Sequence, residues 1–246
     1  MTIACARCPL RKQPLFVAMT EDEVDFMGRF KTGELSVDAG TTLLLEGSSS
    51  PQLYTVFSGM GTRYTTLENG NRQVINFLFP GDFIGLQASL MGEMKHSVES
   101  STSMVLCAFK RDDLWNLFRA QPNRAYDLTW IAAVEEHFLG ETIATLGQRD
   151  AAQRISWAFL RIASRVRSVG LGSTGPEGTT VPLPFRQQDL ADALGLSLVH
   201  TNKTLARLRD RKLASWQDGI LHVPNHAALA AIAMVEPDPE EKRPIL

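Results

Sequence analysis

Side chains that donate or accept hydrogen bonds recur at helical spacing in the segment from residue 197 to residue 211. If this segment is a helix, Thr201, Leu205 and Leu208 share one face, which we expect to be buried. The outward face then carries Val199, His200, Asn202, Lys203, Ala206 and Arg207. Imidazole, amide and ammonium groups bond to the edges of bases in the major groove, so this face has the chemistry of a DNA-binding surface.

The residues before this segment predict how it is held. From Arg186 onward the sequence is typical of a short helix, which Gly195 would end before Ser197 caps the next helix. Small Ala191 lets the two helices cross closely. Three apolar side chains would fill the angle between them: Leu190, Leu194 and Leu196. The pattern is that of a helix-turn-helix, and the free N–H groups at Ser197 are suited to holding a phosphate.

The predicted DNA-binding segment is more basic than the rest of the chain. The whole chain has a formal net charge of -2, which by itself would not attract phosphates. Between Phe185 and Leu213, however, six basic residues, Arg186 among them, stand against three acidic residues. A phosphate backbone responds to the local field of the surface docked on it, so this basic segment is sufficient.

A hairpin and a last helix are predicted after the basic segment. The runs 213–217 and 220–223 flank Asp218 and Gly219, a dipeptide typical of a two-residue β-turn. This hairpin would be the wing of a winged helix-turn-helix. Asn225 can cap a short helix behind it, and the tail 236–246 is expected to be flexible.

Two larger elements are predicted upstream. Between Gly33 and Lys110, glycines separate short apolar runs, which is typical of an antiparallel β-sandwich or barrel. Between Pro122 and Gly147, apolar residues at helical spacing predict a long helix. Its apolar stripe consists of Leu128, Ile131, Phe138, Leu139, Ile143 and Leu146. The stripe fits either a dimer interface or a face that lies on the chain's own domain.

These elements divide the chain into a β-domain at 1–120, a long helix at 121–148, a winged helix-turn-helix at 149–235 and the tail. The 246 residues, 44% of them hydrophobic, are enough for two modest domains. No apolar run is long enough to cross a bilayer, and the first residues do not have the pattern of a secretory signal. We therefore expect a cytoplasmic protein that does not bind membranes.

The order of these parts resembles the cyclic-AMP receptor and fumarate-nitrate-reductase regulator (CRP/FNR) superfamily. Its most specific pieces are Phe79-Pro80-Gly81-Asp82-Phe83-Ile84-Gly85 and the helix-turn-helix 189–208. The resemblance implies an α+β fold with an N-terminal antiparallel β-roll of the cyclic-nucleotide-binding, jelly-roll type, a long dimerisation helix and a C-terminal winged helix-turn-helix. It also implies a homodimeric transcription regulator that binds double-stranded DNA at a palindromic operator and contacts RNA polymerase.

The resemblance also places the DNA contacts and a ligand pocket. The family's base-contacting positions fall on Leu198, Val199 and Lys203, and its phosphate contacts fall near Gln187, Gln188 and Ser197. Apolar Val199 can at most pack on a thymine methyl group. The Gly-Glu and Arg-Ser pairs that hold a cyclic nucleotide correspond to Gly81-Asp82, followed by Gly85, and to His96-Ser97. Because an always-charged guanidinium is replaced by imidazole, control by cyclic AMP is not expected, and the effector stays unknown.

Three cysteines are too few for the four-thiolate iron–sulfur cluster of the oxygen-sensing members. Cys5 and Cys8 have the Cys-x-x-Cys spacing of a redox switch or of half a metal site, and a family remnant is an equal alternative. Cys107 is interpreted as a small apolar residue of a β-strand. Haem bound through His96 or His137 is a further alternative for the effector.

Other classes of protein fit the sequence less well. A cupin-like metal-dependent oxygenase needs several histidines in its β-roll, and His96 is the only histidine before residue 110. The sequence has neither a Gly-x-Ser-x-Gly nucleophile motif nor a phosphate loop, so we do not expect an enzyme. We expect a DNA-binding dimer whose β-roll responds to a redox, gas or small-molecule signal, and a dimer with no effector, regulated by its own abundance, is the alternative.

Overall fold

The computed structural model describes residues 2–236 and 242–246, which form two compact units. The first unit contains the chain up to Gly70, then Ile75–Glu136 and Lys242–Leu246. The second contains Asn71–Val74 and the chain from His137 through the last helix. Among the described residues, no helix has the length and apolar character needed to span a bilayer.

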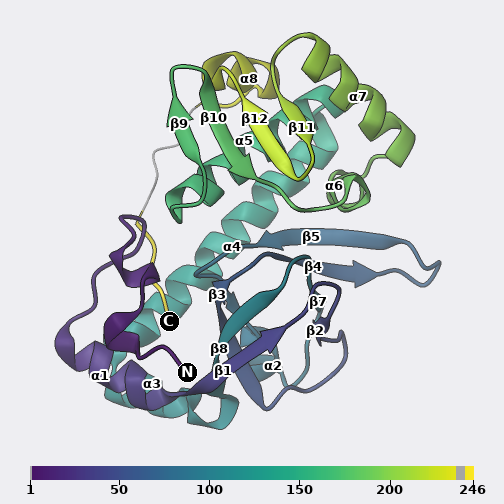
Figure 1. The fold of residues 1–246 in the computed structure, drawn as a ribbon. Coiled ribbons are helices and arrows are strands. Elements are labelled where there is room, and N and C mark those ends of the chain that lie inside the picture. The colour runs from purple at the N-terminus through teal and green to yellow at the C-terminus, as the bar shows by residue number, and fades with distance from the viewer. Residues whose placement is uncertain (1, 237–241) are drawn as a thin grey trace. The chain divides into compact units, whose positions relative to one another are not determined.

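Two four-stranded sheets form the β-roll of the first unit (Figure 1). The first has the order β1-β8-β3-β6, with strands Lys31–Val37, Met104–Lys110, Gln52–Ser58 and Phe83–Ile84. The second has the order β2-β7-β4-β5, with strands Thr42–Leu44, Ser97–Ser100, Gly61–Thr66 and Arg72–Leu78. The antiparallel pairing of β8 with both β1 and β3 confirms the predicted architecture. Gly59 (φ 89°) makes the β3–β4 turn, where a Cβ atom would lie 2.4 Å from the Ser103 carbonyl oxygen.

Apolar side chains form two clusters in this unit. One lies inside the roll and includes Val56, Leu78, Ile84 and Leu106. The other joins the roll to the helices around it, through Phe26, Met27, Phe30, Leu53, Phe109, Leu128 and Ile131. The helical elements of this unit are η1 (Cys5–Arg7), η2 (Leu10–Lys12), α1 (Glu21–Phe30), α2 (Leu86–Met91), η3 (Arg111–Asp113) and α3 (Leu114–Ala120). A capping box between Thr20 and Glu23 begins α1, whose phenylalanines fill the second cluster.

The long helix is α4 (Pro122–Gln148), and its first half contributes to the second cluster. Leu128 is 2% exposed and Ile131 is 6% exposed, both against the chain's own core. Their predicted place in a dimer interface is therefore wrong. The helical spacing of the stripe was correct, but spacing does not identify the neighbour that a helix face contacts.

In the second unit, α5 (Ala151–Ser168) follows α4 and begins at the predicted cap. The Asp150 carboxylate accepts a hydrogen bond from the Gln153 N–H (2.9 Å), and the Gln153 side-chain oxygen accepts one from the Asp150 N–H (2.9 Å). The buried face of α5 includes the expected residues Ile155, Phe159, Ile162 and Val166. The Phe138 ring on α4 stacks on Trp157 of α5, with ring centroids 6.0 Å apart.

The rest of this unit is a small sheet with three helices around it. The sheet has the order β11-β12-β10-β9, with strands Ser215–Gln217, Ile220–Val223, Gly178–Pro182 and Ser173–Gly175. The helices are α6 (Gln187–Leu194), α7 (Leu198–Asp210) and α8 (His226–Ala233). Asn225 caps α8 as predicted, accepting a hydrogen bond from the Ala228 N–H (3.0 Å).

The expected flexible tail needs a correction. Residues 237–241 lie outside the described part, but Lys242–Leu246 belongs to the first unit and packs against it. Ile245 is 4% exposed and Leu246 is 7% exposed. A composition rich in proline and glutamate predicted a loose segment, whereas these two apolar side chains and Arg243 have partners far away in sequence.

Candidate nucleic-acid interface

The turn between α6 and α7 has the geometry that its residues predict. Gly195 ends α6 in the left-handed region (φ 60°, ψ 39°), where a residue without a Cβ is favoured. The Leu196 N–H donates to the Ala191 carbonyl (3.0 Å), which closes the turn. The Ser197 hydroxyl then accepts a hydrogen bond from the His200 N–H (3.2 Å) and starts α7. The two helices therefore form a helix-turn-helix.

The two faces of α7 differ sharply in exposure. Thr201 is 0% exposed and Leu208 is 1% exposed, so both anchor the helix inside the unit. Val199 is 65% exposed on the other side. The side chains exposed with it are Ser197, Leu198, His200, Asn202, Lys203 and Arg207. The outward face of α7 is therefore the face expected from the sequence.

One anchor of α7 was missed and another was overstated. Thr204 is buried, and its hydroxyl donates to the His200 carbonyl (2.9 Å) within the helix. Leu205, expected to be buried, is only half-buried, and Ala206, expected on the outward face, is half-buried as well. Thr204 lies three residues after Thr201 and four before Leu208, so the spacing alone could have identified it.

The candidate phosphate contacts at the start of α6 already have partners in the protein. The Arg186 guanidinium makes two hydrogen bonds to the Asp189 carboxylate (3.0 and 2.7 Å), and this carboxylate also accepts the Arg186 N–H (3.0 Å). Gln188 donates to Asp192 (2.5 Å), and Gln187 is exposed. Arg186 and Gln188 could therefore contact a phosphate with the N–H groups that these hydrogen bonds leave over.

The predicted wing is the β11–β12 hairpin. Its turn residues Asp218 (φ 50°) and Gly219 (φ 72°) both have positive φ, as a two-residue turn of this kind requires. The Trp216 indole N–H donates to the Leu183 carbonyl (2.9 Å), and its ring meets Phe159 edge-on, with centroids 6.0 Å apart. These contacts fix the base of the wing.

Arg154 on α5 joins three parts of the second unit. Its guanidinium donates to the carbonyls of Leu146 at the end of α4 (2.7 Å), Arg149 in the connection (2.8 Å) and Leu194 at the end of α6 (3.0 Å). The last carbonyls of a helix have no partner within it, and the helix dipole favours a cation beside them. Arg154 thus links the long helix to the helix-turn-helix.

Replacing Arg154 with methionine is expected to lower the free energy of unfolding by about 3 kcal/mol, because three carbonyls lose a charged donor in a half-buried place. Urea unfolding measures this loss. Arg167→Met, which removes an exposed arginine from the same helix, is the control. Equal losses in the two variants would contradict the linking role of Arg154.

The second half of α4 leaves part of its apolar stripe uncovered in the single chain. Leu139 is 41% exposed and Ile143 is 72% exposed. Phe138 stacks on Trp157, as described above, and Leu146 is half-buried. Of the six predicted interface residues, Leu139 and Ile143 are thus the clearly exposed ones.

The residues predicted to hold an effector have contacts within the protein. A Cβ on Gly81 would lie 2.3 Å from the Phe16 ring, and Asp82 forms an ion pair with Arg243 (3.2 Å). Gly85 (φ 96°) precedes α2. Ser97 instead accepts the Glu46 N–H (3.0 Å).

His96 is buried in the roll beside a fixed cation. Burial and the Arg63 guanidinium lower its pKa to about 4, so the imidazole is neutral at physiological pH. Arg63 itself pairs with Glu135 (3.0 Å) and donates to the Phe83 carbonyl (2.7 Å). His137, the other proposed haem ligand, is exposed on α4.

The buried imidazole predicts a loss of stability in acid. Between pH 6.5 and 4 the unfolded chain binds a proton on His96 that the folded chain does not, so stability falls as the pH falls through this range. The shift corresponds to about 3 kcal/mol. Unfolding of the wild type and of His96→Gln, compared at pH 7 and pH 4.5, should show a flatter pH dependence in the variant. Parallel profiles would contradict the prediction.

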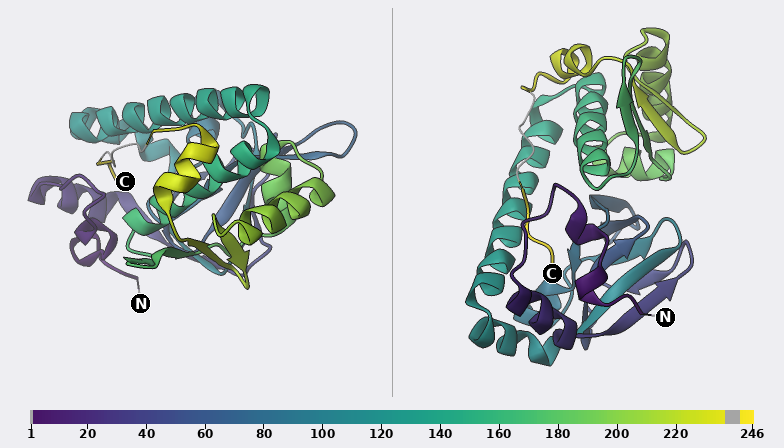
Figure 2. Two further views of the ribbon diagram at one scale, coloured as in Figure 1. Left: turned by 90° about the horizontal axis from the view of Figure 1, so that it is seen from above. Right: turned by 60° about the vertical axis from the view of Figure 1, so that its left-hand side comes forward.

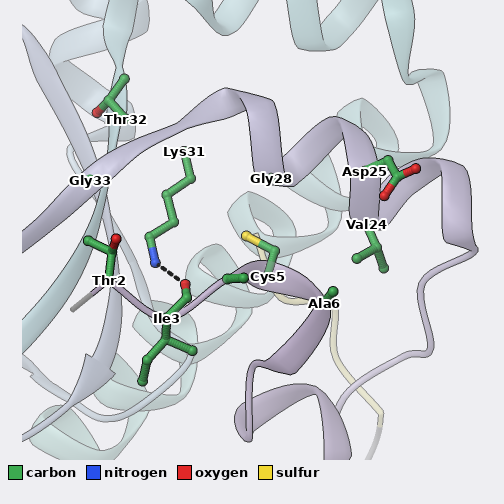
Figure 3. Close-up of a pocket in the computed structure, with 11 residues that line it drawn as sticks. Thr2, Ile3, Cys5, Ala6, Val24, Asp25, Gly28, Lys31, Thr32 and Gly33 are labelled. Carbon is green, nitrogen blue, oxygen red and sulfur yellow. Dashed lines mark hydrogen bonds between the residues drawn. The ribbon is translucent and has the colours of Figure 1, made fainter.

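Cys5 and Cys107 are partly buried, and both thiols lie near the Lys31 ammonium group. Lys31 donates to the Ile3 carbonyl (2.8 Å) beside a cavity of about 390 Å³ that Cys5 lines (Figure 3). Burial raises the pKa of Cys5, and it raises the pKa of Cys107 to about 11 despite the hydrogen bond from Lys31. Both thiols are therefore protonated at neutral pH.

A metal cluster does not fit this arrangement. Among the described residues, no three His, Cys, Asp or Glu side chains are grouped so that they could hold a metal ion. A four-thiolate iron–sulfur cluster needs four deprotonated cysteines, and the chain has three cysteines in all.

The fold and the α7 face define a winged helix-turn-helix protein that carries a β-roll. Residues 34–121 match the family model of the cyclic nucleotide-binding domain, and residues 153–232 match that of the Crp-like helix-turn-helix domain. The chain is 30% identical to the transcriptional activatory protein AadR of Rhodopseudomonas palustris over 173 residues, which are 70% of this chain and 69% of that protein.

Two further similarities cover more of the chain. The transcriptional activator protein FnrL of Cereibacter sphaeroides is 26% identical over 206 residues, 83% of this chain and 81% of FnrL. The structure of FixK2 from Bradyrhizobium japonicum superposes with a TM-score of 0.72 at 22% identity, covering 84% of this chain and 98% of FixK2. The chain belongs to the CRP/FNR family of transcription regulators.

Proposed function

We propose that two copies of this regulator bind a palindromic operator, with α7 of each copy in the major groove of one half-site. The observation that carries the proposal is the exposure of His200, Asn202 and Lys203 on α7, while Thr201 and Leu208 anchor the helix. Phosphate contacts from Gln187, Gln188 and Ser197, with Arg186, would set the register. Two such helices separated by one DNA turn, about 34 Å, would contact half-sites 10 to 10.5 base pairs apart.

Selection of binding sites from random DNA by the purified protein tests this proposal. We expect enrichment of two inverted half-sites, with centres about one helical turn apart. Binding that depends on salt but enriches no sequence would contradict it, because contacts made only to phosphates carry no sequence information.

The proposed dimer forms through the exposed part of the α4 stripe, Leu139 and Ile143. Apolar side chains that are exposed at helical spacing on a long helix have the pattern of a helix–helix seam. The DNA-bound dimer would act in the cytoplasm, contact RNA polymerase at promoters and catalyse no reaction. This part of the proposal is supported by the family, whose matched relatives are transcription regulators.

We further propose that the β-roll is not controlled by cyclic AMP. A cyclic phosphate needs a cation, and His96 stands uncharged at the position expected to supply one, while the neighbouring Arg63 is already paired with Glu135 (3.0 Å). Titration of cyclic AMP should leave operator affinity unchanged, whereas an effector coupling of about 1–3 kcal/mol would change it roughly 5- to 150-fold. Comparing operator binding by aerobically and anaerobically purified protein tests a redox or gas signal against regulation by abundance alone.

A further inference from the structure

The segment Lys242–Leu246 pairs with the N-terminal segment of the first unit. Figures 1 and 2 show this yellow segment beside the purple residues. The Arg243 N–H donates to the Leu15 carbonyl (2.9 Å), and the Val17 N–H donates to the Arg243 carbonyl (2.9 Å), around a parallel bridge between Phe16 and Arg243. Pro244 has no N–H to extend this pairing, so the backbone recognition centres on Arg243.

A largely buried ion pair favours arginine at position 243. The Arg243 guanidinium lies 3.2 Å from the Asp82 carboxylate, and the two side chains are 14% and 8% exposed. The other oxygen of Asp82 accepts the Phe79 N–H (2.8 Å), which holds the carboxylate in place. A buried charge that loses its partner is strongly unfavourable, so this site favours a basic residue over a neutral one.

The two residues after Pro244 are apolar and buried. Ile245 and Leu246 are nearly fully buried, and Leu246 joins the cluster that contains Phe26, Phe30 and Phe109. The Thr55 hydroxyl also donates to the Leu246 carbonyl oxygen (2.5 Å). The segment is therefore recognised in three ways: by backbone pairing, by charge and by apolar contacts.

We propose that the first unit carries a peptide-binding site for the sequence Arg-Pro-Ile-Leu, and that residues 243–246 are its tethered ligand. The site consists of Leu15–Val17, Thr55, Asp82 and the adjoining apolar cluster. Backbone pairing with pockets for particular side chains is how proteins commonly bind extended peptides. Asp82, expected from the sequence to contact a small effector, thereby serves a peptide of this chain.

Binding of residues 243–246 attaches the C-terminal end of the described chain to the first unit. Residues 137–235 belong to the second unit and residues from Lys242 belong to the first, so the bound segment returns the chain to the first unit after α8. A tethered ligand acts at an effective concentration on the order of millimolar, which keeps the site filled even at modest intrinsic affinity. Release of the segment would remove this attachment of the C-terminal residues to the first unit.

Peptide binding to the full-length chain tests the proposal. The probe is a fluorescein-labelled peptide with the sequence of residues 242–246, followed by fluorescence anisotropy. The double variant Arg243→Gln, Ile245→Asp should vacate the site and bind the peptide at least tenfold more tightly than the wild type. Lys242→Gln removes the same charge from an exposed neighbour and should behave as the wild type does. A peptide with glutamine for arginine should bind the double variant at least tenfold more weakly.

Equal peptide binding by the wild type and the double variant would overturn the proposal, and so would equal affinity for the two peptides. A milder variant guards against misfolding of the double variant. The Val17 amide, which donates to Arg243, should exchange its hydrogen about tenfold faster in Arg243→Gln than in the wild type or in Lys242→Gln. The same exchange rate in all three proteins would also overturn the proposal.

Discussion

Alanine at Lys203 is expected to weaken operator binding by about 100-fold and to relax the base preference at one position of each half-site. Lys203 is exposed on the face of α7 that we propose enters the major groove. A good base contact supplies roughly 1–3 kcal/mol of discrimination, and a dimer loses two such contacts. Anisotropy titrations with the selected operator and its single-base variants measure both effects.

Arg209→Ala is the matched control for this prediction. Arg209 is another exposed cation of α7, but it lies in the last turn, 3.8 Å from Asp210. Its loss changes the net charge by the same amount without touching the proposed base-contacting face. If Lys203→Ala instead weakened binding equally on all sequences, Lys203 would be a phosphate contact and the assignment of base contact to it would be wrong.

Aspartate at Ile143 is expected to abolish the dimer at micromolar concentration and to lower operator affinity at least 100-fold with it. The side chain is 72% exposed in the single chain, and in a dimer the substitution would place two carboxylates in an apolar seam. Sedimentation velocity gives the oligomeric state, and the same samples give operator affinity. A dimer that survives this change would show that the seam lies elsewhere.

Phe138→Ala distinguishes a loss of dimer from a loss of fold. The Phe138 ring stacks on Trp157 of its own chain, so its removal should lower the free energy of unfolding by about 2 kcal/mol. It should leave the dimer intact. Dissociation on this change, with no loss of stability, would return Phe138 to the interface expected from the sequence.

The helix-turn-helix was predictable because local chemistry determines it. Gly195 ends a helix and Ser197 begins one, and both choices depend only on neighbours a few residues away. The orientation of α7 followed from the spacing of Thr201 and Leu208. Only Leu205 was placed too deeply, because spacing gives the direction of a side chain but not the amount of protein that covers it.

The remaining features depend on contacts between distant parts of the sequence. The α4 stripe extends from Leu128 to Leu146, yet Leu128 lies in the chain's own core while Ile143 is exposed. No periodicity marks the point where the neighbour changes. Likewise, nothing near Arg243 indicates that its partner is Asp82, so the segment 242–246 was expected to be loose.

The apolar side chain of Val199 on the outward face of α7 has a consequence for modified DNA. An aliphatic group in the major groove can favour thymine only through its C5-methyl group. Cytosine methylated at C5 presents the same group at the same place. Enzymatic methylation of a cytosine facing Val199 should therefore strengthen binding, and uracil substituted for thymine there should weaken it, which would make this regulator responsive to epigenetic marks in its promoters.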